Sequence, residues 1–199
     1  MNKIVKLAAA ALTLGLLSTA AFAGNALYDG EGVVITPAAV SADASVDASA
    51  TFPAVKRGHI VAYESDKKRG SIIVDTHANR LYFVLGFNKA IEYKVATAKP
   101  GFEWAGTHKV SSKTQWPDWR PPVEMRQRRP ELPAYMAGGP KNPLGARAMY
   151  LGGSIYRIHG TNEPSSIGKH ASSGCIRMLN ADVEELYQLV KIGTEVTVL

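Results

Sequence analysis

The chain has 199 residues, 46% of them hydrophobic and 20% charged, which suits one domain with an ordinary core and is too short for several. This composition excludes a wholly disordered chain, and the absence of a Gly or Pro period excludes a collagen-like one. The formal net charge is +6, and the single cysteine, Cys175, excludes an internal disulfide and a zinc site built mainly from thiolates.

Residues 1–23 have the organisation of a secretory signal peptide. Lys3 and Lys6 give a basic start, residues 7–17 form an apolar run, and residues 21–23 read Ala-Phe-Ala, a small-x-small cleavage site. The apolar run is short for a bilayer span, and an N-terminal membrane anchor is the alternative. We therefore expect an exported protein with no stable membrane insertion after signal cleavage.

Residues 24–57 are predicted to be a flexible, acidic, Ala/Ser-rich tether, and residues 58–199 the folded domain. Residues 24–55 contain four acidic residues and no Lys or Arg, and too few large apolar side chains to offset the entropy of ordering. The positive charge is therefore concentrated in the domain. It suggests an anionic partner such as wall polymer or lipid headgroups, or simply a soluble basic surface, whereas nucleic acid is not expected for an exported protein.

The domain is predicted to be mainly β. Short β-branched runs separated by turns indicate strands over residues 59–63, 71–75, 80–87, 90–97, 106–113, 148–151 and 154–159, with a last one around Val196 and Val198. This spacing favours a two-sheet sandwich or barrel-like fold.

One C-terminal helix is expected. Asn180 is a plausible N-cap, and an apolar stripe follows at three- and four-residue spacing up to Val190. Lys191 and Gly193 are typical of a helix end.

A long Pro-rich loop is expected between the strands, over residues 113–147. It holds seven of the eleven prolines and the aromatic residues Trp116, Trp119 and Tyr135. We interpret it as an ordered wall of a substrate groove. The alternative is that both tryptophans only anchor the loop to the core.

Cys175 is the candidate nucleophile. It follows Ser172, Ser173 and Gly174, a polar turn whose backbone amides could surround the oxyanion of an acyl-transfer reaction. A free thiol in an exported protein risks oxidation, so its presence favours a function; the alternative is an inert buried thiol.

His159 is the candidate base. It ends a predicted strand and is followed at once by Gly160, so it is placed to reach a cleft and to form a thiolate–imidazolium pair with the cysteine. A structural histidine at a strand end is the alternative. A zinc site from His159, His170 and Cys175 matches no common ligand spacing, so no metal is expected.

These blocks resemble a known family. His159-Gly160-Thr161, then Gly168, then residues 172–178 are similar to the signature of the YkuD-type L,D-transpeptidases, and residues 138–145 resemble its proteobacterial, ErfK/YbiS-like branch. The resemblance covers about residues 70–199. One departure is Ser173, which stands where many family members have histidine.

The resemblance implies a cofactor-free periplasmic or cell-envelope enzyme acting on peptidoglycan stem peptides. Cys175 would form a thioester with release of the terminal D-alanine, and an amine of a neighbouring stem would resolve it into a 3→3 cross-link. His159 would be the base, oriented by a backbone carbonyl near Gly160. The resemblance also implies an oxyanion site from the amides of Ser173, Gly174 and Cys175, and contact of Arg177 with a substrate carboxylate. Further candidate substrate contacts are Ser172 and, from the Pro-rich segment, Trp116 and Tyr135.

Several alternatives remain open at this stage. Arg177 could instead form a structural ion pair. The same chemistry could use another acceptor, as in attachment to outer-membrane proteins, in an L,D-carboxypeptidase or in an amidase. A non-catalytic peptidoglycan-binding module is the alternative from another class.

Overall fold

The computed structural model describes residues 28–29, 32–33 and 52–199. The predicted signal peptide and most of the predicted tether therefore lie outside the described residues. Within that tether, β1 (Tyr28–Asp29) and β2 (Gly32–Val33) form a short antiparallel pair.

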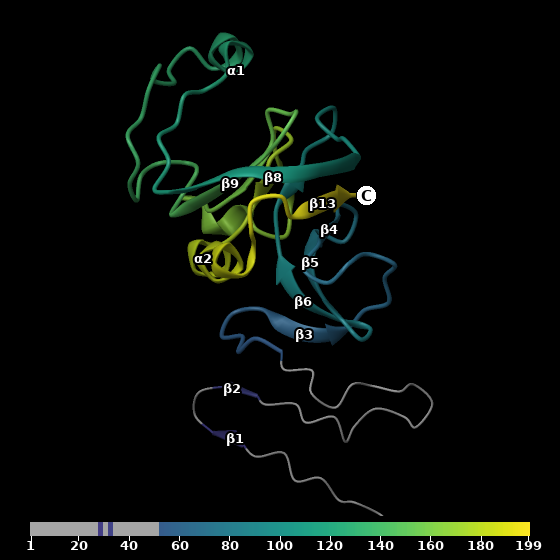
Figure 1. Cartoon of the computed structure of the whole chain (residues 1–199). Coiled ribbons are helices and arrows are strands. Elements are labelled where there is room, and N and C mark those ends of the chain that lie inside the picture. Colours follow the sequence, from purple (N-terminus) through teal and green to yellow (C-terminus); the bar gives the residue numbers. More distant parts are fainter. Residues whose placement is uncertain (1–27, 30–31, 34–51) are drawn as a thin grey trace, which may run out of the picture.

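Nine strands form one mixed sheet in the order β12-β10-β9-β8-β13-β4-β5-β6-β3 (Figure 1). In chain order they are β3 (His59–Ala62), β4 (Ile72–Asp75), β5 (Arg80–Gly86), β6 (Lys89–Lys94), β8 (Gly106–Gln115), β9 (Arg147–Leu151), β10 (Arg157–His159), β12 (Ile176–Arg177) and β13 (Glu195–Val198). The mainly β prediction is confirmed.

The long strand β8 divides this sheet into two halves. Its residues 106–109 pair with β13, and its residues 110–115 pair with β9. The register shifts between Val110 and Ser112, so β8 changes partners at an irregularity. One strand thus belongs to both parts, so the two sheets expected from the sequence are joined into one through β8.

A tight turn fixes the register of β5 against β6. Phe87 and Asn88 join these strands with φ of 51° and 52°, the left-handed pair that a two-residue hairpin of type I′ requires. The sequence predicted a hairpin here, and the structure confirms it.

The predicted C-terminal helix is α2 (Asn180–Leu189), which packs against β9 and β10. Val183 and Leu186 of its apolar stripe are fully buried in the core with Ile158 of β10. Lys113 of β8 donates from Nζ to the carbonyls of Tyr187 and Val190 at 2.6 Å, so a cation satisfies the C-terminal end of the helix.

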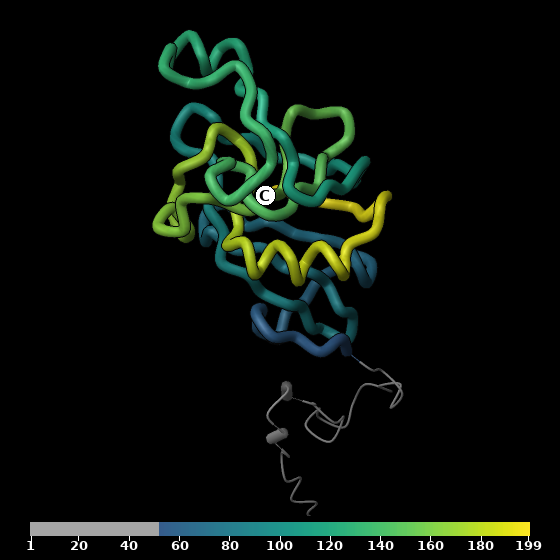
Figure 2. Tube along the Cα trace, turned by 90° about the vertical axis from the view of Figure 1, so that its left-hand side faces the viewer, coloured from purple at the N-terminus to yellow at the C-terminus, as the bar shows by residue number. Residues whose placement is uncertain are grey.

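The Pro-rich segment is not simply a loop, as the sequence had suggested. It contains the short helix α1 (Val123–Arg128) and projects from the domain at the end away from β3 in both Figure 1 and Figure 2. Trp119 and Met136 exchange two backbone hydrogen bonds of 2.8 Å across it. The buried amide of Asn142 donates to the carbonyls of Pro117, Met136 and Ala137 and so joins the two sides of its base.

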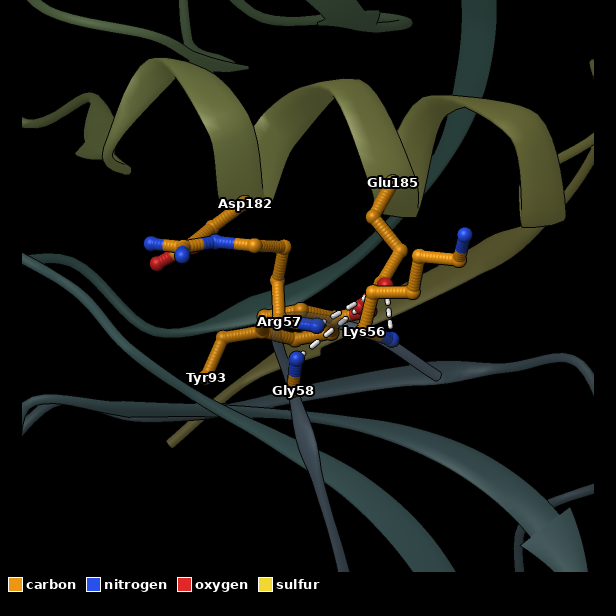
Figure 3. A network of polar contacts seen from close by, with 6 residues as sticks. All are labelled: Lys56, Arg57, Gly58, Tyr93, Asp182 and Glu185. Atoms are coloured by element: carbon orange, nitrogen blue, oxygen red, sulfur yellow. Dashed lines mark hydrogen bonds and ion pairs between the residues drawn. The ribbon is translucent and has the colours of Figure 1, made fainter. Parts of the chain in front are cut away.

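Residues 52–58, here called the N-terminal strap, attach to α2 (Figure 3). The carboxylate of Glu185 accepts hydrogen bonds of 2.6 to 3.0 Å from the N–H groups of Lys56, Arg57 and Gly58 and from the hydroxyl of Tyr93. Phe52 and Val55 pack against the core. Residues 52–57, assigned to the tether from sequence, therefore contact the domain.

Three smaller elements complete the described part of the fold. β7 (Thr97–Ala98) pairs in parallel with β11 (His170–Ser172), and a 3-10 turn, η2, covers Pro164–Ser166. None of the helices in the described part of the chain is long and apolar enough to cross a membrane.

Candidate active site

Neighbouring strands at one edge of the sheet carry the predicted base and nucleophile. β12 is the edge strand and pairs in parallel with β10, with Ile158 opposite Ile176 and His159 opposite Arg177. Side chains alternate between faces, so the two buried isoleucines face the core and His159 and Arg177 lie on the other face. Cys175 comes directly before Ile176, so it belongs to the face of His159.

The imidazole of His159 is held in one tautomer. The side chain is buried, and Nδ1 lies 2.6 Å from the carbonyl oxygen of Gly160. A carbonyl oxygen only accepts, so Nδ1 carries the proton and donates it. The neutral ring then has a free lone pair on Nε2, which is the nitrogen able to accept a proton from a thiol.

Asn180 fixes the peptide unit that orients this histidine. Oδ1 of Asn180 accepts hydrogen bonds from Thr161 N–H at 3.1 Å and from Ala146 N–H at 3.0 Å. Thr161 N–H and the Gly160 carbonyl belong to the same planar peptide unit, so holding one end aims the other at His159. A Cβ on Gly160 would collide with Oδ1 of Asn180, so the position requires glycine.

The prediction of Asn180 as the helix N-cap is therefore wrong. The helix begins at Asn180 itself, and the cap position is Leu179, which makes no side-chain cap bond. The side-chain oxygen of Asn180 accepts hydrogen bonds from two loop N–H groups, and not from backbone N–H groups of its own helix. Both loops are distant in sequence, so local helix-capping rules could not anticipate this choice.

Contacts on every side hold the turn before Cys175. Gly174 has a φ of 103°, and a Cβ there would collide with the ring of Tyr156. Its N–H donates to buried Ser172 Oγ at 3.1 Å, and its carbonyl accepts from Trp104 Nε1 at 2.7 Å. Trp104 stacks on Tyr156 with ring centroids 4.3 Å apart. One of the three amides predicted for the oxyanion is thus already bonded within the protein.

Burial determines the resting protonation of the pair. It lowers the pKa of His159 to about 3; the backbone hydrogen bonds of Gly160 and Leu144 oppose this shift, and the charges of Arg177 and Arg157 reinforce it. Burial raises the pKa of the Cys175 thiol, against the charge and backbone hydrogen bond of Arg157 and the charge of Arg177. The pair therefore rests as neutral imidazole and neutral thiol, and the resting thiolate–imidazolium pair expected from sequence is not favoured.

The other candidate residues divide into two groups. Ser172, Ser173 and Arg177 lie within three residues of Cys175 in the chain. Arg177 Nη1 donates to Glu163 Oε2 at 3.3 Å, so Arg177 makes the ion pair that was its alternative role. Trp116 and Tyr135 lie in the Pro-rich segment and are exposed. Within the described chain, no hydrogen bond or ring contact joins either aromatic residue to Cys175 or His159.

His170 has a different environment from His159. It lies on β11, and its Nδ1 is 3.0 Å from Thr97 Oγ1, which also bonds to Asn79. Among residues 28–29, 32–33 and 52–199, no group of three or more His, Cys, Asp or Glu side chains is arranged to hold a metal ion.

Sequence reasoning missed two residues of this site. Arg157 stands two positions before His159, so the strand alternation could have placed it on the same face. Trp104 is 70 residues from Gly174 and carries no local signal of its contact. Only the tertiary structure identifies it.

Positive charge also gathers away from the thiol. A cavity of about 790 Å³ lies between the turn before β4 and the segment that joins α2 to β13. Its basic lining residues are Lys67, Lys68, Arg69, Lys109 and Lys191. Neither Cys175 nor His159 lines this cavity, so this basic surface is separate from the candidate site.

Comparison with known proteins agrees with this geometry. The family model of the YkuD L,D-transpeptidase catalytic domain matches residues 69–198. The chain is 35% identical over 143 residues to the probable L,D-transpeptidase ErfK/SrfK of Escherichia coli K12, covering 67% of this chain and 45% of that protein. It is 29% identical over 200 residues to a putative L,D-transpeptidase of Fuscovulum blasticum, covering 96% of each.

Solved structures share the fold. An L,D-transpeptidase of Enterococcus faecium superposes with a TM-score of 0.53 at 19% identity, over 66% of this chain and 50% of that one. This chain thus spans about half the length of that protein and 45% of the E. coli relative.

Proposed function

We propose, from the premise that this chain belongs to the YkuD-type family of L,D-transpeptidase catalytic domains, that it is an exported cysteine transpeptidase acting on peptidoglycan stem peptides. The observation that carries the proposal is the pairing of β10 with β12. By this pairing the single cysteine and a histidine whose Nδ1 is bonded to the Gly160 carbonyl share one face of the sheet.

Acyl transfer would begin with attack of Cys175 Sγ on the carbonyl carbon of the third residue of the donor stem. His159 Nε2 takes the thiol proton as the S–C bond forms, so the two ions arise only during attack. The C–N bond to the terminal D-alanine then breaks, and its amine leaves with that proton. A thioester remains on Cys175.

An acceptor amine completes the reaction. It attacks the thioester carbon, passes a proton through His159 to the departing sulfur, and forms the 3→3 cross-link. Because the thioester retains the reactivity of the cleaved bond, the transfer requires no nucleotide and no cofactor.

The oxyanion would be held by the amides of Ser173 and Cys175. The Gly174 amide is bonded to Ser172, so we assign it to holding the turn. The bond from Trp104 to the Gly174 carbonyl supports this assignment, because the N–H of Cys175 belongs to the same peptide unit and points the opposite way.

Export is part of the proposal. It is supported by the basic start, apolar run and Ala-Phe-Ala of residues 1–23, which lie outside the described residues. The mature protein would act in the periplasm, where its peptidoglycan substrates lie.

The test is mass spectrometry of purified muropeptides incubated with the mature protein. We expect loss of terminal D-alanine, a thioester adduct on Cys175 and cross-linked dimers. Cys175→Ala should give none of these and keep its melting temperature, since the change removes one sulfur. More than a few per cent residual activity in that variant would contradict the nucleophile assignment.

The same assay distinguishes the alternatives. Trimmed monomers without dimers would indicate water as the acceptor, and a peptide-linked outer-membrane protein would indicate protein attachment. Binding that survives alkylation of Cys175, with no product from the unmodified protein, would indicate a non-catalytic module.

A further inference from the structure

We propose that Arg157 binds the terminal carboxylate of the donor peptide and so directs Cys175 to the last peptide bond of the donor. This inference rests on the proposed function and names a specificity residue of the same site. Neither the family signature nor the sequence analysis assigns a role to this position.

The register of the sheet places Arg157 beside the nucleophile. Ile158 pairs with Ile176, and the residue before each is Arg157 and Cys175. A backbone hydrogen bond of Arg157 reaches the Cys175 thiol, so the two residues are neighbours. Neighbouring strands lie about 4.8 Å apart, and both side chains are on the face of His159. Arg157 therefore stands on the face where the attacked carbonyl must lie, and its charge acts on the Cys175 thiol.

Arg157 has unused hydrogen-bonding capacity at this position. Among the described residues, the only buried side-chain nitrogen or oxygen atoms without a hydrogen-bond partner are Nε of Arg147 and Nε of Arg157. Arg147 has its guanidinium paired with Glu184 and bonded to the carbonyl of Ala146. Within the described chain no carboxylate pairs with Arg157. Because native proteins satisfy nearly all buried polar groups, this N–H has a hydrogen bond to gain from a ligand.

The contact that the guanidinium makes within the protein is aromatic. The group lies over the ring of Tyr150, with its central carbon 5.3 Å from the ring centroid, and this cation–π contact supplies no carboxylate partner. Arginine presents Nε–H and one Nη–H side by side, a spacing that matches the two oxygens of a carboxylate.

The donor supplies a carboxylate at the required separation. In the terminal residue, only the amide nitrogen and Cα separate the scissile carbonyl carbon from the carboxylate carbon, so the two carbons are less than about 4 Å apart. This is comparable to the spacing between the strands that carry Cys175 and Arg157. Arg177 lies opposite His159 and already pairs with Glu163, so it is less suited to this role.

The experiment compares two donor peptides that differ only at the C-terminus, one ending in a free carboxylate and one in a carboxamide. The measured quantity is the ratio of kcat/KM for acid over amide. We expect wild type to prefer the acid about 10- to 100-fold, the range for hydrogen bonds to a charged partner. Arg157→Gln should bring the ratio within about threefold of unity, and Arg157→Lys should keep part of the preference.

Controls separate recognition from folding and from thiol reactivity. Iodoacetamide labelling of each variant measures the reactivity of the Cys175 thiol. Both donors react with this same thiol, so a change in its reactivity cancels in the acid/amide ratio of kcat/KM. Arg80→Gln removes a guanidinium from β5, where it pairs with Glu92, and should leave the ratio unchanged. The carboxamide also alters the leaving group, and it does so equally in every variant. The decisive comparison is therefore the acid/amide ratio of Arg157→Gln against that of wild type.

Two results would overturn the proposal while leaving the function intact. One is equal use of both donors by wild type. The other is a preference that survives Arg157→Gln and disappears in Arg177→Gln. A wild type that is labelled by iodoacetamide but converts neither donor would contradict the proposed function itself, and the role of Arg157 with it.

Discussion

Folding moves His159 from water, where a histidine has a pKa near 6.5, into a site where burial lowers its pKa to about 3. Between these values the unfolded chain binds a proton that the folded protein does not. The free energy of unfolding that this residue contributes is therefore present above pH 6.5 and is lost as the pH falls toward 3.

We predict that His159→Gln makes the protein less sensitive to acid. By pH 5, wild type should lose about 2 kcal/mol of unfolding free energy relative to pH 7 through this residue, and the variant should not. Urea unfolding of both proteins at the two pH values measures the difference. An identical loss in both would mean that His159 is protonated in the folded state.

At the scale of elements, helix α2 joins the N-terminal strap to the site. Glu185 on one side holds the strap, and Asn180 at its first residue holds the peptide of Gly160. Burial alone would raise the pKa of Glu185, but the hydrogen bonds from Gly58 and its other donors outweigh it and hold that pKa below its usual value. A charged carboxylate is thus favoured at this junction.

We predict that Glu185→Gln lowers the free energy of unfolding by about 2 kcal/mol, because its amide group would face backbone N–H donors. Glu184→Gln is the matched control. That carboxylate is partly exposed and pairs with Arg147 at 3.4 Å, so we expect a change of less than about 1 kcal/mol. Thermal and urea unfolding measure both variants.

Truncation tests the same contacts independently. A chain that starts at Phe52 should keep the wild-type melting temperature, and one that starts at His59 should melt several degrees lower because the strap is removed. If both melt alike, the strap does not stabilise the domain, and the boundary expected from sequence at residue 58 is the correct one.

At the scale of the whole molecule, the Pro-rich segment projects from the domain (Figure 2). Asn142 at its base is buried. Trp119 is 8% exposed and Trp116 is 42% exposed. Trp119 is therefore placed to anchor the segment. Contact of Trp116 with the substrate stays a prediction, which its exposure allows.

We predict that Trp119→Ala lowers the melting temperature by about 6 °C or more, as expected for loss of a large buried side chain. Trp116→Ala should leave it unchanged and raise KM for muropeptides, with no effect on iodoacetamide labelling. Thermal melting and steady-state kinetics measure the two effects. Normal KM in Trp116→Ala would remove this residue from the substrate site.

The sequence by itself determined the elements whose causes are local. The apolar stripe of residues 183–190 predicts α2, and the turn at Phe87 and Asn88 predicts the β5–β6 hairpin, because periodicity and turn geometry act over a few residues. The same holds for the segments around His159 and Cys175, whose chemistry and glycine neighbours are visible in the printed chain.

Only the tertiary structure decided what depends on burial and on partners distant in the chain. The neutral resting state of His159 follows from burial, and the lack of a carboxylate partner for Arg157 within residues 52–199 follows from how the strands pack. Asn180 serves two loops where a local rule predicted a cap, and Trp104 contacts Gly174 across 70 residues. Such features have no signature within a short window, because desolvation and hydrogen-bond competition are settled only when separate segments pack together.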